Sequence, residues 1–156
     1  MEKTKKISIA MLILPLILLC STEIRAQEEP TSQIKKMSKL EFRKQIWNPQ
    51  KDKRFTYYGS KPVIIDFNAD WCMPCKKLAP ILEKLQAEYG DSLQIYSIDI
   101  DREANQKPDY AEVFRFQTIP TLLFIKPGQK EKPVPFRVGG KTEEELRGMI
   151  NEMLFK

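Results

Sequence analysis

The sequence contains no histidine and only three cysteines among its 156 residues. Without histidine, covalent haem attachment and mixed cysteine–histidine zinc sites are excluded. Cys20 lies in an apolar N-terminal stretch, whereas Cys72 and Cys75 are three residues apart at the start of a helical pattern. The chemistry of the chain is therefore expected to depend on this one pair.

The sequence also lacks a large excess or a long run of charges of one sign. The formal net charge is +5, and no long basic run occurs. Residues 1–26 carry four of the 26 Lys and Arg and two of the 21 Asp and Glu, so 22 against 19, or +3, remain after them. This mild balance does not predict binding to nucleic acid.

Residues 1–26 have the organisation of a secretory signal peptide. Lys3, Lys5 and Lys6 precede the apolar run Ile7–Leu19, which has thirteen residues, whereas a bilayer of ~30 Å needs about 20. Ala26 is the small residue expected just before the cleavage site. We therefore expect export, with cleavage near Ala26 leaving a soluble protein.

Two alternatives to that interpretation are open. Cys20 could accept a lipid and anchor the protein, although the residue before it is Leu19 rather than the usual small residue. The apolar run could instead form a buried N-terminal helix. Cleavage would leave 130 of the 156 residues, a normal size for one domain.

The remaining chain reads as an α/β domain over residues 38–156, preceded by a polar, loose segment over 27–37. Capping-box sequences at Ser38–Glu41 and Thr142–Glu145 predict two helix starts. The other predicted helices cover 72–89 and 108–114, and the predicted strands cover 62–67, 93–100, 121–125 and a return near 136–138. This order predicts a parallel β-α-β unit followed by an antiparallel hairpin.

The Cys-x-x-Cys pair favours exchange between a dithiol and a disulfide. A zinc site would need ligands from a second chain, haem attachment would need histidine where Lys76 stands, and a bridge over so short a loop stabilises little. At a helix start, free backbone amides favour the thiolate of Cys72. Cys75, one turn further on, is placed to resolve a mixed disulfide, and Pro74 suits the first turn.

These motifs resemble the thioredoxin family. The resemblance is carried by Asp66-Phe67, by the run from Ala69 to Lys76, by Ala79-Pro80 and by Thr118-Ile119-Pro120-Thr121, and it extends from about residue 62 to the C-terminus. It implies a thioredoxin-like fold with a mixed sheet of four to five strands flanked by helices. The export signal and the longer N-terminal region are similar to those of periplasmic thioredoxin-like proteins.

The resemblance also implies a substrate-binding surface. Pro120 matches the family's cis-proline, whose preceding residue, here Ile119, pairs with a substrate peptide through its backbone. Trp71 would flank the nucleophile and Gly139 would line the groove. The complete implied surface consists of Trp71, Met73, Pro74, Ile119, Pro120 and Gly139. The plainer alternatives are an ordinary strand-start proline, a packing tryptophan and a turn glycine.

Asp66 is a carboxylate within a predicted buried strand. Burial should raise its pKa and suit it to take a proton from Cys75, the role that the family gives it. A purely structural carboxylate is the alternative. The chain also departs from the family: Ser97 stands where many members carry a lysine near this aspartate, Asn68 replaces a common aromatic residue, and Met73 replaces the glycine between the cysteines. The redox potential is therefore not inherited from typical members.

The preferred function is a protein-disulfide reductase acting on exported proteins. The alternatives are a disulfide oxidase or isomerase whose pair rests oxidised, and a redox-inert peptide-binding module. No cofactor, metal or nucleic acid is expected. Because no nucleotide-binding motif is seen, the expected electron donor is a membrane thiol carrier, and we expect a monomer.

Overall fold

The computed structural model describes residues 34–102 and 110–156, all of which belong to one unit that covers residues 32–156. The predicted signal peptide over 1–26, Cys20 and Pro108 lie outside the described residues. Within the described part of the chain, no helix is long and apolar enough to cross a membrane.

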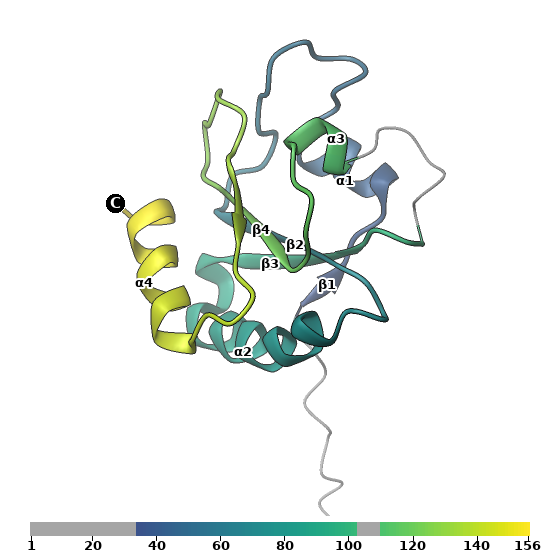
Figure 1. Ribbon diagram of the computed structural model, residues 1–156. Helices are drawn as coiled ribbons and strands as arrows, with labels where there is room; N and C mark the ends of the chain where they lie inside the picture. Colours follow the sequence, from purple (N-terminus) through teal and green to yellow (C-terminus); the bar gives the residue numbers. More distant parts are fainter. Residues whose placement is uncertain (1–33, 103–109) are drawn as a thin grey trace, which may run out of the picture. The chain divides into compact units, whose positions relative to one another are not determined.

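A mixed five-stranded sheet forms the centre of this unit (Figure 1). The strands are β1 (Lys35–Lys36), β2 (Val63–Asn68), β3 (Gln94–Asp99), β4 (Thr121–Ile125) and β5 (Pro135–Arg137). Their order across the sheet is β1-β3-β2-β4-β5, with parallel pairs β1–β3 and β3–β2 and antiparallel pairs β2–β4 and β4–β5. The predicted α/β class, the β-α-β unit and the hairpin are confirmed.

The prediction of a loose segment over 27–37 is wrong for its last residues. Lys35 and Lys36 form β1 against Tyr96 and Ser97, and Met37 is buried in the core. A two-residue edge strand with two exposed lysines has no apolar alternation to indicate it. Its pairing comes from β3, far away in the sequence, and the folded domain therefore begins before residue 38.

Helices cover both faces of the sheet. They are α1 (Lys39–Gln45), α2 (Met73–Tyr89), the short 3-10 helix η3 (Gly90–Ser92), α3 (Tyr110–Phe114) and α4 (Glu143–Leu154). Helices α1 and α3 lie on one face, and α2 and α4 lie on the other (Figure 1). Both predicted capping boxes are present, at Ser38 with Glu41 and at Thr142 with Glu145. Gly90 ends α2 with a φ of 50°, in the region that favours glycine.

The two faces have different cores. Aromatic side chains dominate the α1 and α3 face, where Phe42, Phe67, Tyr110, Phe114 and Phe116 pack together. Aliphatic side chains dominate the other face, which contains Ile64, Leu78, Leu82, Leu85, Leu122, Leu146 and Ile150. Since side chains alternate along a strand, Asp66 lies on the same face as Ile64, beneath α2.

Candidate active site

Cys72 and Cys75 are joined in a disulfide at the N-terminus of α2. Their sulfur atoms are 2.07 Å apart and their Cα atoms 5.2 Å apart. Cys72 is the N-cap residue, Pro74 lies in the first turn, and the backbone amide of Cys75 donates to the Cys72 Sγ at 3.2 Å. In the reduced protein, this amide and the positive end of the helix dipole would favour the thiolate of Cys72.

The disulfide lies between two exposed side chains. Cys72 and Cys75 are both buried and pack with Ala69 and Ile119. In contrast, Trp71 is 66% exposed and Met73 is 60% exposed. The exposed apolar surface around the disulfide therefore comes from the two neighbours of Cys72.

The exposed indole of Trp71 is held by a polar network. Its indole Nε1–H donates to a carboxylate oxygen of Asp101, just after β3. Arg102 in turn pairs with Asp70 at 3.4 Å and with Asp99 at 3.1 Å. This polar network holds the indole beside Cys72.

The peptide bond between Ile119 and Pro120 is cis, as predicted. It lies immediately before β4, and the Thr121 hydroxyl donates to the Thr118 carbonyl at 2.6 Å across it. Among the described residues, the backbone amide and carbonyl of Ile119 take part in no backbone hydrogen bond. These two polar groups are available to an extended chain.

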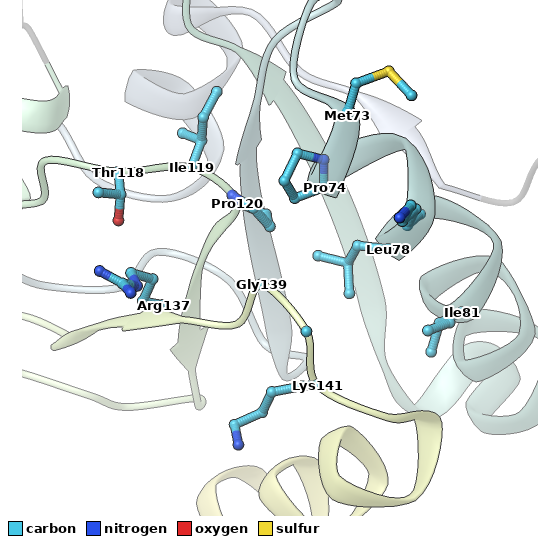
Figure 2. A pocket seen from close by; sticks show the side chains of 12 residues that line it. Met73, Pro74, Leu78, Ile81, Thr118, Ile119, Pro120, Arg137, Gly139 and Lys141 are labelled. Atoms are coloured by element: carbon cyan, nitrogen blue, oxygen red, sulfur yellow. The ribbon is translucent and has the colours of Figure 1, made fainter.

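A groove of about 630 Å³ runs between this loop and the start of α2. Figure 2 shows Pro120 and Leu78 facing each other across it, with Met73 and Pro74 at the α2 end. The complete lining is Met73, Pro74, Lys77, Leu78, Ile81, Thr118, Ile119, Pro120, Arg137, Gly139, Gly140 and Lys141. Of the six residues expected to bind substrate, the structure brings five together here and places Trp71 outside.

Gly139 borders the groove beside Pro120. A Cβ atom added to Gly139 would lie 3.6 Å from the Cδ of Pro120, which is an ordinary van der Waals contact, and its backbone has no positive φ. The fold therefore does not require glycine at this position. The absence of a side chain leaves space in the groove instead.

Asp66 is a buried carboxylate with one hydrogen-bonded oxygen. Asn68 Nδ2 donates to its Oδ2 at 2.9 Å and to the Oγ of Ser97 at 2.8 Å. Asp66 Oδ1 has no hydrogen-bond partner among the described residues. Burial raises the pKa of Asp66 from 3.8 to about 7, and the hydrogen bond from Asn68 opposes this rise. The predicted upward direction is confirmed.

A smaller hollow of about 220 Å³ connects Asp66 to the disulfide. Its lining includes Asp66, Asn68, Cys75 and Ser97. A hollow of this size and polarity can hold water, so a proton can pass between Cys75 and Asp66 without direct contact. The common hollow places Asp66 within reach of the resolving cysteine.

Sequence reasoning missed the role of Asn68 in this arrangement. It identified Asn68 only as a departure from the family's usual aromatic residue. The strand register places Asp66 beside Ser97, and Asn68, two residues after Asp66 on the same face, bridges both. Because side chains alternate between the faces of a strand, the sequence could have indicated that Asn68 lies next to Asp66. The contact with Ser97 could not be predicted in this way, because it depends on the register of β2 against β3.

The described part of the chain contains no cluster of side chains that could bind a metal ion. Within residues 34–102 and 110–156, no group of three or more His, Cys, Asp or Glu is placed to hold a metal ion.

The sequence is similar to known thioredoxins along most of the described chain. It matches the thioredoxin family model over residues 33–152. It is 34% identical to the thioredoxin of Borreliella burgdorferi over 116 residues, which are 74% of this chain and 93% of that protein. The identity to the thioredoxin of Mycolicibacterium smegmatis is 43% over 96 residues, which are 62% of this chain and 81% of that protein. The thioredoxin of Bacillus subtilis is 39% identical over 104 residues, 66% of this chain and 93% of its own length.

Proposed function

The chain belongs to the thioredoxin family of thiol-disulfide oxidoreductases, and from this membership we propose that it reduces disulfide bonds in exported proteins. The observation that carries the proposal is the position of the Cys72–Cys75 pair. It caps α2 beside an apolar groove whose opposite wall begins at a cis-proline. This arrangement offers an activated sulfur and a place for the client chain in one surface.

The reaction begins on Cys72 of the reduced protein. Its thiolate attacks one sulfur of the client disulfide, forms a Cys72–client disulfide and releases the first client thiolate, which takes a proton from water. An extended client segment would lie along the groove and use the free backbone groups of Ile119. Met73 and Pro74 would contact the segment next to the reacting sulfur.

The second step needs a proton acceptor for Cys75. The Cys75 thiol gives its proton to the carboxylate of Asp66 through the hollow that both line. The Cys75 thiolate then attacks the Sγ of Cys72, closes the internal disulfide and releases the second client thiolate, which receives that proton through solvent. Two electrons pass to the client, and a pKa of about 7 suits Asp66 to both accepting and releasing the proton.

The residues between the cysteines favour electron flow from this protein to its clients. The dipeptide is Met73-Pro74, so neither residue between the cysteines is a cation that would stabilise the Cys72 thiolate and make the pair a strong oxidant. This supports reduction over oxidation or isomerisation of clients. The presence of both cysteines, joined in a disulfide at the start of α2, also argues against a redox-inert binding module.

We also propose that the protein is exported to the periplasm and acts there as a soluble monomer. The support is the sequence of residues 1–26, whose basic start, apolar run and terminal Ala26 suit cleavage by a signal peptidase. A membrane thiol carrier would supply the electrons. Mass spectrometry of the protein recovered from its host would show Gln27 as the first residue; a modified Cys20 would instead establish a lipid anchor.

The activity is tested by insulin reduction in the presence of dithiothreitol. We expect the wild-type protein to accelerate the reduction and Cys72→Ser to abolish the acceleration. A Cys75→Ser variant is the matched control, because it should accumulate a mixed disulfide with insulin that Cys72→Ser cannot form. Equal rates for the wild type and Cys72→Ser would end the catalytic interpretation.

A further inference from the structure

We propose that Lys36, on the edge strand β1, is a positioning residue that holds the Asp66 carboxylate in its ionised form across the hollow that the two residues line. The inference rests on the proposed function, since it concerns the proton acceptor of the second step. Lys36 is exposed, and the sequence alone did not connect its segment with the active site.

The strand register aligns the two residues. Asp66 on β2 is the partner of Ser97 on β3, and Ser97 is the partner of Lys36 on β1. Registered partners point to the same face of a sheet, so Lys36, Ser97 and Asp66 form a row beneath α2. With strands about 4.8 Å apart, the Cα atoms at its ends are roughly 10 Å apart. The short side chain of Ser97 lies between them, and the flexible four-carbon stem of lysine can cross it.

The hollow provides the path between the two charges. Lys36, Ser97, Asp66 and Cys75 all line it. Asp66 Oδ1, which is fully buried, has no hydrogen-bond partner among the described residues, and a buried carboxylate oxygen without one is costly. An ammonium group at the mouth of this hollow is attracted to that oxygen directly or through water.

The other acidic groups near Lys36 already have partners. Asp70 and Asp99 both pair with Arg102. Glu41 accepts from the Ser38 amide at 2.8 Å as part of the capping box of α1. These acids line a second hollow together with Lys36, and Asp70 also lines the first, but each carboxylate already has the partner named above. Asp66 is the carboxylate on this face whose second oxygen remains unsatisfied in the described residues.

Two further charged groups face the same hollow from α2. Lys76 and Glu83 both line it and carry opposite charges, so their effects on Asp66 oppose each other. Neither lies on the row that the strand register defines. Lys36 therefore supplies the cation that the sheet itself holds in line with Asp66.

The test is an NMR titration of the Asp66 carboxyl in the full, oxidised protein, in which the disulfide cysteines do not titrate. Lys36→Met should raise the pKa of Asp66 by about 0.5 to 1, and the difference should shrink at 1 M salt, because a partly exposed charge pair is screened. Lys36→Arg should restore the wild-type pKa. The matched control is Lys35→Met, because Lys35 is registered with Tyr96 and points to the opposite face.

Lys35→Met is expected to leave the pKa of Asp66 unchanged. Equal pKa values for Asp66 in the wild type and Lys36→Met, or equal rises in Lys36→Met and Lys35→Met, would overturn the inference. The titration does not depend on catalysis. A wild-type protein that fails to reduce insulin, together with the rise in Lys36→Met, would refute the proposed function alone. Normal insulin reduction without the rise would refute the inference alone.

Discussion

Replacing Asp66 by asparagine should remove most of the pH dependence of stability between pH 5 and 8. Asn approximates the protonated carboxyl in size and keeps an oxygen that can accept from Asn68 Nδ2, but it cannot ionise. The wild-type protein must instead ionise a buried carboxyl as the pH rises, against the cost of desolvation. The substitution therefore isolates the energy of that ionisation.

The magnitude follows from the pKa of Asp66, which burial raises from 3.8 to about 7. Each unit of difference between the two pKa values corresponds to 1.36 kcal/mol, so ionisation of Asp66 costs the folded state about 4 kcal/mol in total. The folded-state value lies above the unfolded one, so between pH 4 and 7 the folded protein holds a proton that the unfolded chain has lost. The free energy of unfolding therefore falls as pH rises, by about 3 kcal/mol between pH 5 and 8, and then levels off.

The assay is urea unfolding of the oxidised protein at pH 5, 6, 7 and 8. This window is unusually clean, because the chain contains no histidine and the disulfide cysteines do not titrate. The terminal amino group is common to both proteins and cancels in the comparison. We expect a falling free energy of unfolding for the wild type and a nearly constant one for Asp66→Asn.

The same slope in both proteins would refute the reasoning. It would mean that Asp66 ionises near its ordinary pKa of 3.8, because water and the charges around the hollow compensate its burial in full. Asp66 would then be a fully ionised carboxylate at neutral pH and a weaker acceptor for the Cys75 proton.

Two further substitutions test the groove and the fold. Gly139→Ala should raise the KM for a protein disulfide several-fold but leave a small-molecule disulfide unaffected, because the added methyl group enters the groove while lying in ordinary contact with Pro120; a free energy of unfolding changed by more than about 0.5 kcal/mol would instead give Gly139 a structural role. Thr142→Ala should lower the free energy of unfolding by about 1 kcal/mol, because the hydroxyl caps the Glu145 amide of α4. Thr142→Ser keeps that hydroxyl, and equal losses in the two variants would contradict the capping argument.

The features predicted well from the sequence are those set by local patterns. The position of Cys72 at the start of α2 is predictable, because the apolar spacing of a helix begins directly after it. The cis bond before Pro120 is predictable from a short motif that the family shares. Asp66 was placed in a buried strand because apolar, β-branched residues surround it in the sequence. The raised pKa of its carboxyl follows from that burial alone.

The features that the sequence did not predict depend on contacts between distant segments. Strand β1 consists of two lysines and forms only because β3 offers its edge. The bridge from Asn68 to Asp66 and Ser97, and the hollow beside them, need the register of three strands. The hydrogen bond from the Trp71 indole to Asp101 joins the segment before α2 to the turn after β3, and no local pattern in the sequence indicates it.

The central claim is that the Cys72–Cys75 pair donates electrons to client disulfides. Its most direct test is the equilibrium redox potential of the pair, measured against defined ratios of reduced and oxidised glutathione. A reductase predicts a value below the glutaredoxin range of about −200 to −230 mV, towards the about −270 mV of thioredoxin. A value near the about −120 mV of strong periplasmic oxidants would contradict the account and assign the protein to disulfide formation.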